Sequence, residues 1–325
     1  MSISKCVYPQ LCRIYSKKIK DLNSISLHNL SCQKLRVISG NMGLFKYSTS
    51  FQYVHFLDYV KMTDGLYYMM KGLKTNKILE RLKLTLPKDC ITQRNMKYMA
   101  NVISRFSSLR DLEITLQGIG EMPNSGMLLS PLPNALKKLS NLESFKIEPS
   151  FLPDAEETYI ELSQVLQSRQ SIKCLSGVID SNPYCLRFFR ATKVLIKNFS
   201  SLKMLTLSIT WRLNICETLE GIFQKLPALE HLSLTPISFE STTCDWLAFA
   251  QAFRNLTELK SLELDLEFCQ ELASSILKYI EQGVHQTASL EKIKISMNRF
   301  ELGDEDFTEE LHILLKSLPQ VSNFQ

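Results

Sequence analysis

The sequence contains no long apolar run, although 45% of its 325 residues are hydrophobic. No stretch approaches the roughly 18 consecutive apolar residues that are typical of a membrane-spanning helix. The first fourteen residues also lack the continuous apolar core of a secretory signal peptide. We therefore expect no membrane span and an intracellular, cytoplasmic location.

Motifs that carry chemistry are absent as well. The nine cysteines are dispersed from Cys6 to Cys269 without a C-x-x-C pair, which favours a reducing compartment over a disulfide framework. The five histidines form no H-E-x-x-H, and neither a P-loop, G-x-G-x-x-G nor G-x-S-x-G occurs. We expect no enzymatic activity, no cofactor and no metal site.

What the sequence does contain is an apolar pattern, L-x-x-L-x-L, that returns every 27 to 33 residues. Its copies are Leu79–Leu84, Leu109–Ile114, Leu142–Ile147, Ile172–Gly177, Leu202–Leu207, Leu229–Leu234, Leu259–Leu264 and Leu290–Ile295, with a truncated ninth at Val321–Phe324. The last two apolar residues of each copy are two apart, so both face one side of a short strand. The residue between them faces the other side.

The segments between the predicted strands show a second apolar periodicity, that of a helix. Apolar residues recur at helical spacing in Asn95–Phe106, Thr218–Leu226, Trp246–Phe253 and Phe307–Leu318, and Ser130–Leu139 is also expected to be helical. One strand and one helix cannot bury their apolar faces alone, whereas stacked copies bury them against their neighbours. This predicts a parallel sheet with helices outside it.

The motif resembles the leucine-rich repeat family, and its length is most similar to the ribonuclease-inhibitor-like class, over about Leu79 to Gln325. The resemblance implies an α/β solenoid, a horseshoe with a parallel sheet on the concave face and helices on the convex face. The family's Asn or Cys after the strand is present only as Asn298. Instead, an apolar residue often follows two positions after the last strand leucine, as in Leu86, Leu116, Ile209, Leu266 and Met297. We therefore expect irregular, divergent repeats.

The N-terminal part differs from the rest in charge and aromatic content. Residues 1–50 hold eight Lys and Arg against Asp21 alone, and Phe45–Tyr68 holds eight of the thirty aromatic residues. We predict an irregular cap at 1–70, in which Leu22, Ile25 and Leu27 form a degenerate strand, and an array of about eight to nine repeats at 71–325. The basic start suits a solvated cap, an arm for an anionic partner, or a transit peptide. The aromatic residues suit either a plug for the stack or an interface.

The polar strand positions predict the concave surface. Between the second and third apolar positions stand Lys83, Glu113, Lys146, Ser176, Thr206, Ser233, Glu263 and Lys294. This face is mixed in sign and rich in hydroxyls, so nucleic-acid binding there is not expected. It suits a protein surface with its own charge pattern. The candidate partner-binding residues are Arg81, Lys83, Asp111, Glu113, Lys146, Lys203, His231, Glu263 and Lys294.

The resulting functional hypothesis is a non-enzymatic scaffold that binds a protein through its concave face or its N-terminal cap. Two alternatives stay open. One is a GTPase activator resembling the leucine-rich-repeat proteins that act on Ran, for which Arg81 and Arg110 are the available arginines. The other is a substrate-recognition subunit of a ubiquitin ligase. Neither the partner nor the oligomeric state follows from the sequence, because one fold serves many functions.

Overall fold

The computed structural model describes residues 24–28, 50–54, 65–117, 125–148, 156–168, 171–179, 200–211, 215–239, 246–265, 282–283, 287, 289–296 and 323–324. The chain divides into two compact units, Met1–Val165 and Leu166–Gln325. We call them the first and the second unit. The predicted division at residue 70 concerns the N-terminal cap and stays a prediction.

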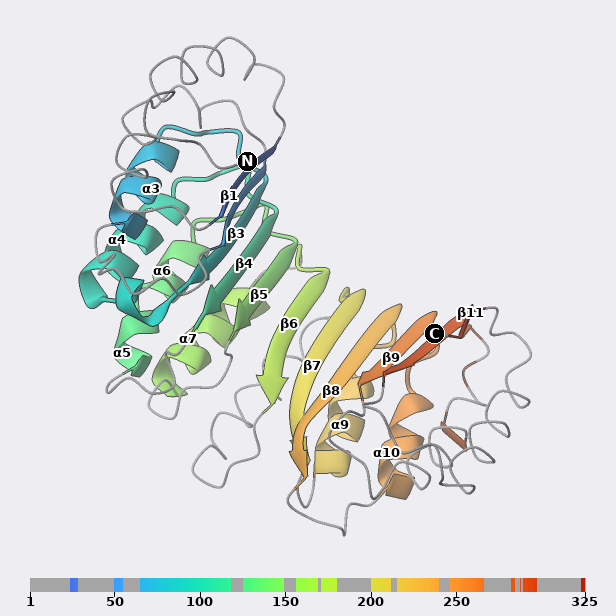
Figure 1. The fold of residues 1–325 in the computed structure, drawn as a ribbon. Helices are drawn as coiled ribbons and strands as arrows, with labels where there is room; N and C mark the ends of the chain where they lie inside the picture. The colour runs from blue at the N-terminus through green and yellow to red at the C-terminus, as the bar shows by residue number, and fades with distance from the viewer. Residues whose placement is uncertain are drawn as a thin grey trace. The chain divides into compact units, whose positions relative to one another are not determined.

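The first unit is an α/β structure in which all described strand pairs are parallel. Its strands follow one another in the sheet in the order of the sequence, and the helices lie along one face of them (Figure 1). The elements are β1 (Ser24–His28), β2 (Ser50–Val54), α3 (Gly65–Leu73), β3 (Arg81–Leu86), η3 (Lys88–Cys90), α4 (Gln93–Ile103), β4 (Asp111–Leu116), α5 (Ser125–Leu129), α6 (Leu132–Leu136), β5 (Ser144–Glu148) and α7 (Glu156–Gln167).

The second unit is built in the same way. Its strands are again parallel neighbours in sequence order, and α9 packs against α10. The elements are β6 (Cys174–Ile179), β7 (Met204–Trp211), α9 (Ile215–Phe223), β8 (His231–Phe239), α10 (Trp246–Phe253), β9 (Ser261–Asp265), β10 (Lys292–Ser296) and β11 (Asn323–Phe324). The predicted α/β class with a parallel sheet and flanking helices is therefore confirmed.

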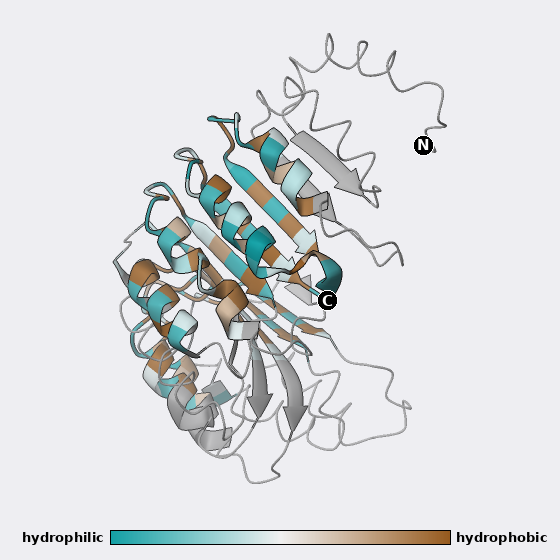
Figure 2. Ribbon diagram, turned by 90° about the vertical axis from the view of Figure 1, so that its left-hand side faces the viewer, coloured by the Kyte–Doolittle hydropathy of each residue, from teal (hydrophilic) through white to brown (hydrophobic). Residues whose placement is uncertain are grey.

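The register places equivalent positions of the sequence pattern side by side. Leu82 pairs with Leu112 and Leu84 with Ile114, and the same alignment holds in the second unit, where Leu232 pairs with Leu262. In β4, β5, β9 and β10 buried apolar residues alternate with half-exposed polar ones, and Figure 2 shows hydropathy alternating along strands of the sheet. The apolar side of the sheet and the inner sides of the helices thus form the core.

The first leucine of the pattern lies before the strand, not in it. Leu79 is fully buried, yet β3 begins two residues later at Arg81. Its equivalent Leu109 donates its backbone N–H to the carbonyl of Phe106 at 3.0 Å, and the same turn recurs from Leu229 to Leu226. In the copies where the structure describes it, the position three residues before the first leucine is buried too, so these turns add further side chains to the core: Asn76, Phe106, Leu139, Leu226, Leu256 and Thr287.

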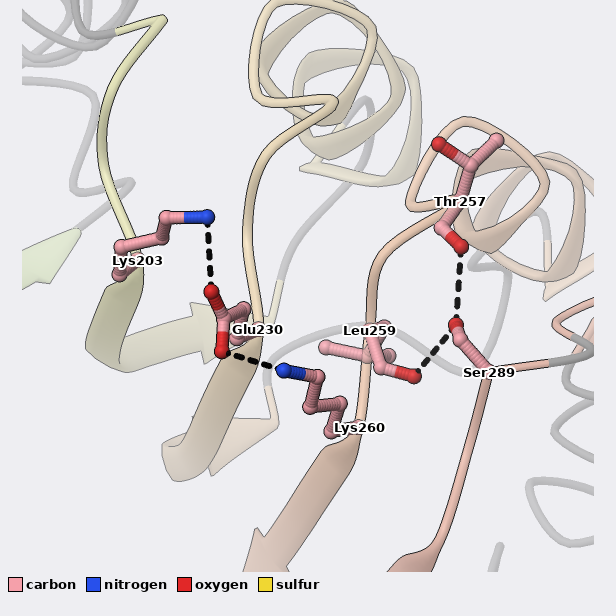
Figure 3. Close-up of polar contacts among 6 residues, drawn as sticks. All are labelled: Lys203, Glu230, Thr257, Leu259, Lys260 and Ser289. Carbon is pink, nitrogen blue, oxygen red and sulfur yellow. Dashed lines mark hydrogen bonds and ion pairs between the residues drawn. The ribbon is translucent and has the colours of Figure 1, made fainter.

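A ladder of side chains links the turns that precede neighbouring strands. Ser108 Oγ donates to the Lys77 carbonyl at 3.1 Å, and Asn141 Nδ2 donates to the Ser107 carbonyl at 2.8 Å. In the second unit, Ser289 Oγ lies 2.8 Å from the carbonyls of both Thr257 and Leu259 (Figure 3). These hydrogen bonds satisfy backbone carbonyls that lie before the strands and therefore have no partner in strand pairing.

Several predicted helices are confirmed with shifted ends. Trp246–Phe253 coincides with α10, whereas α4 and α9 begin and end two or three residues before the predicted segments. The predicted helix over 130–139 is wrong in extent, because α5 ends at Leu129 and α6 spans only Leu132–Leu136. Pro131 caps α6 and has no backbone N–H with which to join the two pieces. The segment 307–318 lies outside the described residues.

Two strands precede the first predicted repeat. The predicted strand around Ile25 is confirmed as β1, and β2 lies within the aromatic segment and pairs with β3. The apolar residue two positions after the strand leucine, Leu86 or Leu116, is buried within its strand, as expected. None of the helices that the structure describes is long and apolar enough to cross a membrane.

Candidate interaction surface on the open face of the sheet

In each unit the described helices lie along one face of the strands, and we call the opposite face of each unit its open face. In β4, β5, β9 and β10 every second residue is half-exposed on this face. Because parallel strands lie about 4.8 Å apart, equivalent residues of neighbouring strands form rows across the face. The middle row is the set of residues between the second and third apolar positions.

The middle row of the first unit is a chain of alternating charges. Glu113 Oε1 lies 2.9 Å from Lys83 Nζ and 3.6 Å from Lys146 Nζ. Lys146 Nζ also lies 2.8 Å from Glu148 Oε1. Burial disfavours the charged form of Lys146, but its hydrogen bond to Glu148 and the charges of Glu148 and Glu113 outweigh this and raise its pKa. Lys146 therefore stays protonated across the physiological range.

Two further ion pairs flank this row. Arg81 Nε lies 3.6 Å from Asp111 Oδ2, and Arg110 donates to Glu143 at 2.9 Å. The two arginine side chains are 71% and 59% exposed, so solvent screens both pairs strongly. The pairs thus leave the guanidinium groups accessible to a partner.

The middle row of the second unit is mostly hydroxyl-bearing. Ser176, Thr206 and Ser233 are half-exposed and aligned by register, and the row ends with the ion pair of Glu263 and Lys294. The hydrogen bond to Glu263, together with its charge, raises the pKa of Lys294. This unit therefore offers hydrogen-bonding groups beside one charged pair.

At the start of these strands the second unit carries a three-residue charge bridge. Glu230 Oε1 lies 2.7 Å from Lys203 Nζ, and Glu230 Oε2 accepts from Lys260 Nζ at 2.8 Å (Figure 3). Each residue directly precedes a strand, and the backbone N–H groups of Glu230 and His231 both donate to the Lys203 carbonyl. The strand register thus places the three side chains beside one another.

The bridge changes the acidity of its central residue. Hydrogen bonds from Lys203 and then Lys260, reinforced by both positive charges, lower the pKa of Glu230 from 4.5 to about 2. The hydrogen bond to Glu230 and its charge raise the pKa of Lys260. The bridge is therefore fully ionised at neutral pH.

We expect the Glu230→Gln substitution to destabilise the protein at pH 7 and to do so less at pH 2.5. Because the folded pKa of Glu230 is depressed, its contribution is complete above the unfolded pKa near 4.5 and disappears as the pH falls through about 2. Urea unfolding midpoints at pH 7, 4.5 and 2.5 measure this. A midpoint difference that stays constant down to pH 2.5 would contradict the bridge.

The residues that begin the strands of the second unit form another row, which we call the first row. In β6, β7 and β8 these residues are Cys174, Met204 and His231, and none of them is Lys, Arg, Asp or Glu. Cys174 pairs with Met204, and Met204 pairs with His231. Met204 is 42% exposed, so this row presents an apolar side chain to solvent. This row gives the second unit a small apolar centre between its hydroxyl row and its charge bridge.

Among the described residues of the open face, Cys174 and His231 are too far apart to form a nucleophile–base pair. Cys174 and His231 are separated by the strand that holds Met204, which places their backbones roughly 10 Å apart. Within the described parts of the chain, no three His, Cys, Asp or Glu side chains group together to hold a metal ion. What the face does offer is charge pairs, hydroxyls and one exposed methionine.

The residues that the sequence predicts for this surface fall into four groups. Arg81, Asp111, Lys83, Glu113 and Lys146 come together on the first unit, where register and ion pairs join them. In the second unit, Lys203 belongs to the charge bridge, His231 to the first row, and Glu263 pairs with Lys294. Sequence reasoning missed Glu230 and Lys260, although the sequence shows them at the position directly after the first leucine, equivalent to Lys203.

No protein-family model and no curated protein matches this chain.

Proposed function

We propose that the protein is a leucine-rich-repeat scaffold, a horseshoe whose open sheet face is concave and binds another protein. The observation that carries this proposal is the alternation of charge across the open face of the first unit, from Lys83 through Glu113 to Lys146. The aligned strand register and the recurring turn before each strand support the repeat assignment.

Alternating charge determines which kind of partner fits. When neighbouring positive and negative side chains in a row cancel, the row produces only a weak net electrostatic field. It therefore does not attract a polyanion over long distances. A protein surface with the complementary order of charges makes new pairs with the same groups. Charge complementarity of this kind contributes more to specificity than to affinity.

The ion pairs of the face are also easily exchanged. Half-exposed pairs such as Lys83 with Glu113 contribute only about 0–1 kcal/mol to stability, so a partner that replaces them disturbs the fold little. The first row of the second unit, around Met204, adds apolar area that a partner would bury. Both features suit a protein-binding face better than a purely structural one.

Charge reversal tests the proposal. We expect Lys146→Glu and Glu263→Lys, made separately in the full-length chain, each to reduce capture of the specific partner by about 10-fold or more. Each change places a like charge opposite a group of the partner, and such contacts cost several kcal/mol at an interface. The measurement is crosslinking affinity purification from native lysate, followed by titration of the purified partner.

The matched control is Lys225→Glu, at an exposed position two residues after the end of α9 in the second unit. It changes the net charge by the same amount as Lys146→Glu and should leave binding unchanged. If both open-face variants retain every partner, the open face is not the binding surface. A partner lost on deletion of residues 1–70 would place recognition in the N-terminal part instead.

The two alternative functions stay predictions. Arg81 and Arg110 are the arginines that a GTPase activator would use, and both are exposed beside acidic partners. An activator raises GTP hydrolysis by a small GTPase, and a ligase subunit co-purifies with its adaptor. The partner's identity separates both from a scaffold.

A further inference from the structure

The helices of the first unit carry a second surface, distinct in composition from the open face. Six exposed cations lie on α3, α4 and the turns that follow them: Lys71, Lys74, Lys77, Arg94, Lys97 and Arg105. The segments 65–78 and 91–109 contain no Asp or Glu at all. We call this the α3–α4 basic surface.

The charge separation is specific to this part of the unit. The acidic residues nearest to the two segments in sequence are Asp64, Glu80, Asp89 and Asp111, and all four lie outside both helices. Segment 125–142 continues the pattern with exposed Lys137 and Lys138 and no acidic residue. The pattern ends at α7, which begins with two glutamates.

Two tyrosines lie among the cations. The ring of Tyr67 on α3 contacts that of Tyr98 on α4, with centroids 4.6 Å apart, and the Arg94 guanidinium carbon lies 6.0 Å from the Tyr67 centroid. Both tyrosines are half-exposed. Arg94 and Tyr98 are four residues apart, so they lie on the same side of α4, and Arg105 follows in the turn after the helix.

The apolar residues of the two helices point the other way. Met69, Met70, Met96, Met99 and Val102 are all buried in the core. Figure 2 shows strongly hydrophilic residues along the helices of this unit. Within α3 and α4, no Leu, Ile, Val, Met, Phe or Trp whose burial the structure describes is exposed, and on the segment after α3 only Ile78, next to Lys77, is exposed among such described residues. A surface that inserts into a membrane presents such side chains, so these helices do not suit one.

We propose that the α3–α4 basic surface binds single-stranded nucleic acid, with the cations on phosphates and the tyrosines under bases. Clustered Lys and Arg supply the electrostatic footprint, and aromatic rings supply stacking platforms that tolerate any base. The sequence-based argument against nucleic acid considered only the rows of the open face. It does not apply to the helices, where charge is of one sign and aromatic rings are present.

The first test is binding of a fluorescein-labelled poly(U) RNA of roughly 20 nucleotides to the full-length chain, followed by anisotropy. Roughly four phosphate contacts would lower the affinity about 50-fold between about 50 and 200 mM KCl. We expect Arg94→Gln/Lys97→Gln to weaken binding by roughly 10-fold or more and to reduce the salt slope by about 1.4.

The matched control is Lys225→Gln/Arg254→Gln, which removes two exposed cations that follow α9 and α10 in the second unit. It makes the same change in net charge and should leave the affinity and the salt slope unchanged. Circular dichroism of all variants confirms that the fold is retained. Equal weakening by the control would mean that only net charge matters, and it would overturn the assignment.

A second variant tests the stacking role. Tyr98→Leu keeps an apolar side chain but removes the ring, and we expect about 5-fold weaker RNA binding with an unchanged salt slope. A purely electrostatic surface would not respond in this way. An unchanged affinity for RNA overturns the proposed role of the tyrosines.

Two other kinds of anionic partner test whether the surface prefers nucleic acid. Poly-glutamate and vesicles with about 30% phosphatidylserine are offered in the same assay and salt. Weak binding to both, with tight binding to RNA, supports a nucleic-acid surface. If either binds as tightly as RNA and loses affinity with Arg94→Gln/Lys97→Gln, the occupant is an acidic protein or a membrane, and the proposal fails.

Discussion

Replacing Leu262 by glutamate is expected to lower the free energy of unfolding by more than about 5 kcal/mol. Leu262 is fully buried in β9, and the register places it between Leu232 and Ile293. The substitution removes the packing of a leucine and introduces a carboxyl group with no described polar partner. A carboxyl group buried among apolar side chains is either charged at high cost or protonated through a strongly raised pKa.

The adjacent residue provides the control, because side chains on a strand alternate between faces. Glu263→Leu exchanges the same two residue types in the opposite direction on the open face. It removes the half-exposed pair with Lys294 and should change stability by less than about 1 kcal/mol. Urea denaturation monitored by far-UV circular dichroism measures both variants. If Leu262→Glu is tolerated, or if Glu263→Leu is equally damaging, the assignment of faces is wrong.

The alternation of apolar residues made the strands predictable, but not where they begin. In Leu79–Leu84 the last two apolar residues lie in β3, as a period of two requires. Leu79 lies before the strand, and in copies such as Leu109 the equivalent leucine donates its backbone N–H to the carbonyl three positions earlier. That earlier position varies, being Phe106, Leu139 or Leu226 in different copies, so it did not stand out as part of a motif.

The strand β2 could not be separated from its surroundings in the sequence. It lies in a segment dense in aromatic residues, where a plug or an interface accounts for the composition equally well. Its pairing with β3 identifies it as a strand, and such pairing depends on the tertiary structure and not on the local sequence. The end of α5 was predictable in principle, because Pro131 interrupts a helical pattern.

The candidate surface was predictable wherever strand geometry applied. Lys83, Glu113 and Lys146 occupy one pattern position, and parallel register brings such positions together. Glu230 and Lys260 precede their strands, and the two-residue alternation predicts which face a side chain lies on only within a strand. The α3–α4 basic surface was missed because charge was compared between the first fifty residues and the remainder, not helix by helix.

The ladder of Ser108, Asn141 and Ser289 illustrates a different limit. The Asn or Cys that the leucine-rich repeat family carries after the strand is present only as Asn298, so the resemblance predicts that a side-chain ladder after the strands is missing. The structure places serine or asparagine directly before the first leucine, where these side chains reach carbonyls of the preceding turn. Such short polar residues favour hydrogen bonds to nearby backbone groups, so the signal was present but unassigned.

Phe253→Ala is expected to lower the free energy of unfolding by about 3–5 kcal/mol. Phe253 ends α10 and is fully buried, and its ring centroid lies 5.8 Å from that of the equally buried Phe223 on α9. Truncation removes the apolar contact and leaves a cavity that backbone-fixed neighbours fill only in part. Urea denaturation at neutral pH measures the loss.

A double-mutant cycle separates the aromatic contact from general packing. Phe223→Ala alone should cost a similar amount, and the double variant should lose about 0.5–1.5 kcal/mol less than the sum, because tilted ring pairs contribute beyond their buried area. Lys225→Ala, an exposed change two residues after Phe223, should stay within about 0.5 kcal/mol of wild type. Strict additivity of the two phenylalanine variants would mean that α9 and α10 do not stabilise each other through these rings. The stacking of neighbouring helices in the second unit would then depend on the surrounding leucines alone.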